Sequence, residues 1–119
     1  MVHCHGALDS LEQALQGVEA RKRCKFKNTL ALQVERLANG QRFSKEHFRD
    51  EADLPVNPLT GKRDKFWALK RIPVRGYCWK SARHTNTWFI SHYVHKDYNK
   101  LKKKDIEKVH NNWRNVEGS

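Results

Sequence analysis

This chain of 119 residues lacks the features that mark several large classes of protein. Its three cysteines, Cys4, Cys24 and Cys78, are an odd number with no close pair, which favours reduced thiols over a disulfide-stapled secreted domain. No apolar run approaches the ~20 residues that a membrane-spanning helix needs. Residues 1–6 lack the charged and apolar regions of a secretory signal. We therefore expect one cytoplasmic domain with no membrane partner.

The sequence also lacks the motifs of several enzyme classes. It contains no glycine-rich phosphate loop and no nucleophile elbow. Few acidic residues occur in the second half, so catalysis by two carboxylates is not expected. His3, Cys4 and His5 cluster only at a terminus, and His92 and His95 on a strand would not share a face as they would on a helix. We expect no metal site and no cofactor.

Positive charge, in contrast, is abundant and unevenly distributed. Residues 60–119 hold 15 Lys and Arg against 5 Asp and Glu, whereas residues 1–59 hold 9 against 8, which together give the net charge of +11. Aromatic residues are interleaved with this charge, and they are Trp67, Tyr77, Trp79, Trp88, Tyr93 and Tyr98. Cationic groups beside flat rings suit nucleic acid. A membrane surface is disfavoured, because its basic residues would gather on one amphipathic helix.

Apolar periodicity predicts two helices in the first third of the chain. Apolar residues recur at helical spacing over residues 7–22 and again over 26–38, although Gly17 weakens the first pattern. Asn39 and Gly40 are typical of a helix end. The short basic join over residues 22–25 would make the two helices an antiparallel hairpin.

Strand patterns dominate the second half. Residues 41–64 are expected to be mostly loop because of their Pro and Gly positions. The three predicted strands are Lys65–Ile72, Val74–Ser81 and Thr87–His95. A strand before the first helix is only weakly indicated by Val2 and Cys4.

These patterns together predict an α+β fold. A helical hairpin over residues 7–38 would cover one face of a small antiparallel sheet over 65–96, and a short helix over 103–114 would follow. We expect the other face of the sheet, or its rim, to carry the charge.

Four segments of the chain resemble RelE/HigB-type toxins of bacterial toxin–antitoxin systems, particularly the HigB-like, phage-derived branch. Leu30–Gly40 is similar to the family's second helix, and Phe66–Arg71 to its Leu-Trp-Glu-Leu-Arg strand. Arg75–Trp79 and Phe89–Lys96 are similar to the two strands that follow. The resemblance covers most of residues 8–114, but Ala68 replaces the family's Glu.

This resemblance implies a RelE-like fold and an activity. The activity would be metal-independent cleavage of mRNA, commonly on the ribosome, by attack of a 2′-OH on the adjacent phosphate. The implied partners are mRNA, the ribosome and a cognate antitoxin with an acidic surface, which could be a helix-turn-helix protein.

Such cleavage needs a proton donor, a proton acceptor and cations around the phosphorane. We expect His95, or His92, to be the acid or base, assisted by Tyr98. Arg71 and Arg75 would hold the phosphate, with Lys70 in support. The residues expected to bind RNA more generally are Lys80, Arg83, Lys96, Lys100, Lys102, Lys103 and Lys104.

Each of these residues also has a plainer interpretation. His92 could be a packed histidine, the lysine run of 100–104 a solvated helix start, and Trp67 and Trp88 core residues. The function has alternatives too: a ParE-like toxin that acts on DNA gyrase without nuclease activity, or a small basic nucleic-acid-binding protein without toxicity.

Overall fold

A central five-stranded sheet organises the computed structural model, which describes residues 2–40, 48–58, 60–71, 73–84, 87–95 and 101–117. The strands are β1 (Val2–His3), β2 (Phe48–Asp53), β3 (Lys65–Arg71), β4 (Val74–Lys80) and β5 (Trp88–His95). They lie in the order β1-β5-β4-β3-β2, with β1 parallel to β5 and every other pair antiparallel. The sheet is thus mixed but mostly antiparallel.

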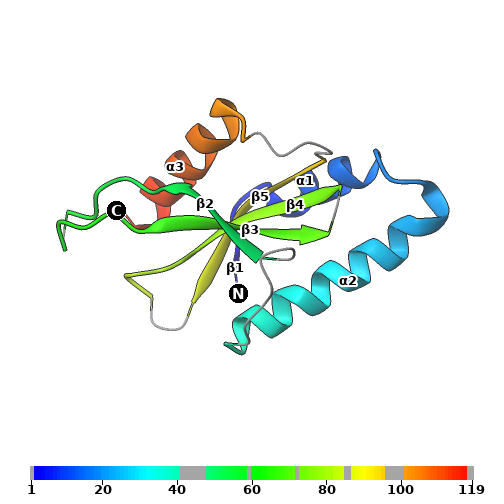
Figure 1. Ribbon diagram of the computed structural model, residues 1–119, viewed down its shortest axis with the longest axis horizontal. Helices are drawn as coiled ribbons and strands as arrows, with labels where there is room; N and C mark the ends of the chain where they lie inside the picture. The colour runs from blue at the N-terminus through cyan, green and yellow to red at the C-terminus, as the bar shows by residue number, and fades with distance from the viewer. Residues whose placement is uncertain are drawn as a thin grey trace.

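Within the described ranges, three helices pack against this sheet: α1 (Ala7–Leu15), α2 (Ala20–Ala38) and α3 (Lys103–Glu117). Figure 1 shows α3 on one side of the sheet and α2 on the other. The expected α+β class, with two N-terminal helices, a sheet and a C-terminal helix, is confirmed. None of the helices in the described part of the chain is long and apolar enough to cross a membrane.

The sheet has an apolar core on each face. The first core joins α1 and α2 to the sheet, and its buried members include Leu11, Leu15, Leu30, Leu37, Leu69, Cys78, Ile90 and Tyr93. The second core lies under α3, and its buried members are Leu54, Phe66, Ala68, Tyr77, Trp79, Phe89, Val109 and Trp113. The sequence predicted charge on this second face of the sheet or on its rim. α3 and the second core cover part of that face, and Lys70 and Arg75 lie on it as well.

The boundary between the first two helices differs from the expected one. The first helix ends at Leu15 rather than at residue 22, and the second begins at Ala20 rather than at residue 26. Arg23 stabilises the intervening turn, since its Nε donates to the Val18 carbonyl at 3.0 Å and its Nη2 to the Gln16 carbonyl at 3.3 Å. The basic join is helical because Lys and Arg are good helix formers.

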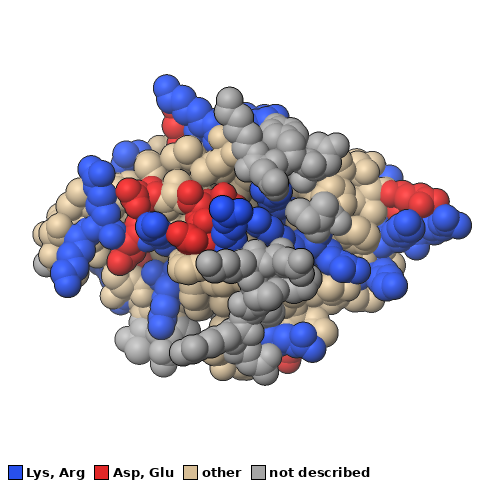
Figure 2. Space-filling model, viewed as in Figure 1, with Lys and Arg blue, Asp and Glu red and all other residues tan. Residues whose placement is uncertain are grey.

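The predicted loop over residues 41–64 contains an edge strand, β2. Its sequence, Phe-Arg-Asp-Glu-Ala-Asp, has poor strand propensity but suits an exposed sheet edge, where charges discourage pairing with another chain. Figure 2 shows acidic side chains among Lys and Arg on the face where β2 lies in Figure 1. Residues 41–47 lie outside the described ranges.

A bulge in β5 decides which side chains share a face. Tyr77 pairs with His92 and the next residue, Cys78, pairs with Ile90, so Ser91 is the extra residue. The bulge lets Ile90 and Tyr93 both enter the first core. His92 contacts Tyr77, a member of the second core, with ring centroids 5.3 Å apart. His92 therefore lies on the α3 face.

Candidate functional site

Cationic side chains from three neighbouring strands meet on the α3 face of the sheet. Lys70 of β3 pairs with Arg75 of β4 in the strand register, so their side chains lie next to each other on one face. Arg49 of β2 pairs with Ala68, which belongs to the second core and so faces α3 as well. We call Arg49, Lys70 and Arg75 the basic cluster.

The electrostatics of this cluster are unfavourable for a lysine. Burial lowers the pKa of Lys70 below its usual range, the positive charges of Arg75 and Arg49 lower it further, and the Glu51 carboxylate opposes them. Lys70 is 8% exposed and Arg75 is 2% exposed, whereas Arg49 is exposed. A buried, electrostatically destabilised lysine beside two arginines is the kind of arrangement that occurs at anion-binding and proton-transfer sites.

His92 is tied into a buried polar chain beside this cluster. Its Nε2 lies 3.0 Å from Asp105 Oδ1 in the first turn of α3, and its Nδ1 lies 2.8 Å from Ser91 Oγ. Asn112 of α3 donates to Ser91 Oγ at 2.8 Å. Because the Ser91 hydroxyl accepts from Asn112, it can donate to His92 Nδ1 while His92 Nε2–H donates to Asp105. In this arrangement the Ser91 hydroxyl and both ring nitrogens of His92 each have a hydrogen-bond partner.

The grouping of Ser91, His92 and Asp105 has the composition of a catalytic triad but not its accessibility. Ser91 is fully buried, His92 is 2% exposed and Asp105 is 5% exposed. A nucleophile must reach a substrate carbonyl, and this serine cannot. The three residues instead join β5 to α3, which agrees with the plainer interpretation of His92 as a packed histidine.

The other two expected catalytic residues on the strands lie on the opposite face. Arg71 stands over the Phe26 ring of α2, with its guanidinium carbon 5.3 Å from the ring centroid. His95 is exposed, and its ring contacts the position of Gly17 just after α1. The predicted grouping of His95, Arg71 and Arg75 around one phosphate is therefore not what the fold produces, because Arg75 faces α3.

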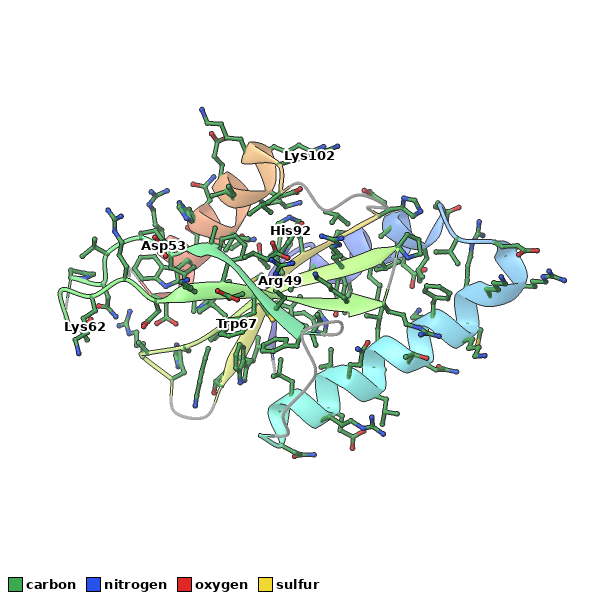
Figure 3. All side chains as sticks on the ribbon, in the orientation of Figure 1. Arg49, Asp53, Lys62, Trp67, His92 and Lys102 are labelled. Carbon is green, nitrogen blue, oxygen red and sulfur yellow. The ribbon has the colours of Figure 1, made fainter. Side chains whose placement is uncertain are left out.

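The residues expected to bind RNA are spread over the molecule. Lys80 is exposed at the end of β4, and Arg83 is exposed near the end of α3, where its backbone N–H donates to Glu117 Oε2 at 3.3 Å. Lys103 and Lys104 are exposed in the first turn of α3, and Lys102 is exposed just before it. Figure 3 shows Lys102 above the sheet. Three further candidates, Lys96, Tyr98 and Lys100, lie outside the described residues.

Two residues of this site were missed from the sequence. Arg49 was assigned to a loop, and Asp105 stood unnoticed among the lysines that begin α3. An acid in the first turn of a helix is a common sequence signal, and it could have drawn attention to Asp105 as a stabilising residue. Nothing in the sequence signals the position of Arg49, since only the pairing of β2 with β3 brings it to Lys70.

The charged groups that the strands bring together at this site are cations. Within the described ranges, no three His, Cys, Asp or Glu side chains lie together in a way that could hold a metal ion. The basic cluster could instead hold an anion. No protein-family model, curated protein or solved structure matches this chain significantly.

Proposed function

We propose that this protein is an endoribonuclease toxin of the RelE/HigB type, which cleaves mRNA, in association with the ribosome, and is neutralised by an antitoxin with an acidic surface. The basic cluster is the observation that carries the proposal. Arg49, Lys70 and Arg75 converge on one face from three strands, at a free-energy cost that an RNA phosphate would offset.

Two further observations support the same proposal. The order of two helices, sheet and C-terminal helix is the order that the sequence resemblance implies. The net charge of +11 suits a polyanionic substrate and an acidic neutralising partner.

Within this proposal each residue of the basic cluster has a different role in cleavage. Arg49, the exposed member, would contact the phosphate directly. Arg75, which is 2% exposed, would not touch the phosphate, and its positive charge would stabilise the phosphorane from behind Arg49 and Lys70. Lys70, whose pKa is lowered, would exchange a proton with the attacking or leaving oxygen more readily than an ordinary lysine. His92 would act as a positioning residue that holds β5 and α3 beside the cluster.

Induced expression in a bacterial host, followed by primer extension on cellular mRNA, tests the proposal. The wild-type chain should arrest growth and produce discrete mRNA breaks. Lys70→Met keeps the length of the side chain but removes the transferable proton, so it should lower the cleavage rate by about 100-fold or more.

The matched control is Lys108→Met, which removes an exposed lysine of α3 outside the cluster and should leave cleavage unchanged. Growth arrest with DNA damage and intact mRNA would replace the proposal with a gyrase poison. No growth effect and no breaks, with the chain folded, would leave a nucleic-acid-binding protein without toxicity.

A further inference from the structure

The α1/α2 side of the sheet carries a cavity of about 580 Å³ that the basic cluster does not share. It lies where β3 begins and β4 ends, at the opposite end of these strands from the basic cluster. Its lining includes Trp67, Trp88, Lys65, Lys80, Arg63 and Asp64. A second cavity of about 330 Å³ shares Lys80 and Trp88 with it and extends to the end of α2. The larger volume lies in the usual range of small-ligand sites, roughly 300–1,000 Å³.

Two indoles line this cavity, and both pack against the Phe48 ring behind them. Phe48 lies parallel to Trp67, with centroids 4.9 Å apart and planes at 4°, and it meets Trp88 edge-on at 5.5 Å. Both tryptophans are only partly buried, although they pack against the first core. Figure 3 places Trp67 below the sheet, on the side of α2. The two indoles are thus held rigidly by Phe48 while part of their surface borders the cavity.

The charged groups around the rings fit a nucleotide better than they fit an acidic peptide. Lys80 and Arg63 supply two cations, and Lys65 supplies a third, which pairs with the exposed Asp50 carboxylate at 3.3 Å and could exchange it for a phosphate. Such cations suit the phosphates on either side of a stacked base. Asp64 is the discriminating group, because a carboxylate accepts hydrogen bonds from the amino and imino groups of a base and repels the carboxylates of an acidic peptide.

We infer that this indole-lined cavity binds one nucleotide unit of single-stranded RNA, with the base against Trp67 and Trp88 and the adjoining phosphates on Lys65 and Lys80. The site lies on the opposite face from the basic cluster. It would hold a strand whether or not that strand is cut, so it does not depend on the proposed cleavage.

Binding of the full chain to a fluorescein-labelled 2′-O-methyl oligonucleotide of about eight nucleotides tests this inference by anisotropy. The 2′-O-methyl group prevents cleavage, so failure here is distinguishable from failure of the proposed function. An oligonucleotide with the same phosphates but abasic residues should bind about 5- to 100-fold more weakly, because it cannot stack. Trp88→Leu should remove most of that difference.

Charge reversal supplies a matched pair of variants. Lys80→Glu and Lys25→Glu change the net charge equally, but Lys25 is an exposed residue near the start of α2, far from the cavity. Lys80→Glu should weaken binding about tenfold more than Lys25→Glu does, and a thermal melt of each variant checks the fold. Because Lys80 is exposed, this pair remains informative even if Trp88→Leu fails to fold.

Three results would overturn the inference. The first is equal binding of the abasic and normal oligonucleotides by the wild-type chain. The second is equal weakening by Lys80→Glu and Lys25→Glu. The third is displacement of the oligonucleotide by a peptide of alternating Glu and Trp, with Lys80→Glu reducing peptide binding more than RNA binding.

Discussion

The two faces of the sheet treat polar groups in opposite ways. The α3 face buries them: Arg75, Ser91, His92 and Asp105 are all at most 5% exposed and lie among the aromatic residues of the second core. The core of the α1/α2 face is richer in aliphatic residues. Gln33 of α2 is buried on this side, whereas His95 and Lys80 are exposed at its margins. A buried polar network needs every partner in place, whereas exposed groups tolerate change.

The two faces therefore suit two different functions, which the total number of basic residues alone would not distinguish. On the α3 face, a few cations are fixed by register and by burial, which suits chemistry at one phosphate. At the far end of the other face, exposed cations surround two indoles, which suits holding a strand. The faces should therefore respond differently to substitution.

The largest expected effect is on the α3 face, from Asp105→Ala. Removing the carboxylate deprives the buried His92 Nε2 of the Asp105 oxygen that lies 3.0 Å away, and the free energy of unfolding should fall by about 3 kcal/mol. Urea denaturation measures it. Glu107→Ala, an exposed acid on the same helix, is the control and should cost less than about 0.5 kcal/mol. Equal effects would mean that the buried chain does not hold α3 to β5.

Gly76→Ala tests the packing of the α1/α2 face. A methyl group at Gly76 would lie 2.7 Å from the Tyr93 ring, which is 4% exposed and cannot move freely because its hydroxyl bonds His3 Nε2 at 2.9 Å. We expect a loss of about 2 kcal/mol in unfolding free energy. In a Tyr93→Leu background, Gly76→Ala should lower the unfolding free energy much less, because the ring that the methyl group meets is gone. Additive effects of the two substitutions would contradict this contact.

Periodicity predicted the elements that bury an apolar stripe or alternate cleanly. The start of α3 was predicted at residue 103 as found, and β4 and β5 each differ from their expected bounds by one residue. The two elements that were missed or only weakly indicated, β1 and β2, have no such pattern. β1 is two residues long and needs β5 beside it, and β2 is mostly charged.

The candidate site was partly predictable for a related reason. The short connection between β3 and β4 places Lys70 opposite Arg75, and strand alternation then puts Arg71 on the other face. The same alternation correctly separates His92 from His95. Contacts between distant segments, such as Arg49 with Lys70 or Asp105 with His92, depend on tertiary packing that no local pattern encodes.

Lys70→Met should have a smaller effect on stability, and one that depends on pH. The charge of Lys70 opposes folding, so at neutral pH the variant should be as stable as the wild type or up to about 1 kcal/mol more stable. The pKa of Lys70 is lowered in the folded state. The destabilisation that its charge causes is therefore fully present at any pH below this folded-state pKa. This destabilisation declines as pH rises toward the ordinary lysine value of 10.5, where the stabilities of the variant and the wild type should converge.

Urea midpoints measured from neutral pH to 10.5 would show this convergence. Lys108→Met, an exposed lysine of α3, should give a difference from the wild type that does not change with pH. A Lys70→Met advantage that stayed constant over the same range would show that the lysine is not destabilised by its neighbours.

Gly17→Ala should have the smallest effect on stability, and it tests whether His92 and His95 lie on opposite faces of the sheet. The new methyl group would meet the His95 ring, but His95 is exposed and its ring can rotate away, so stability should stay within about 0.5 kcal/mol. The imidazole NMR signals should then change for His95 and not for His92, because His92 lies on the opposite face of the sheet, beside Asp105. A shift of the His92 signals of similar size would place both rings in one environment and remove the contrast between the faces.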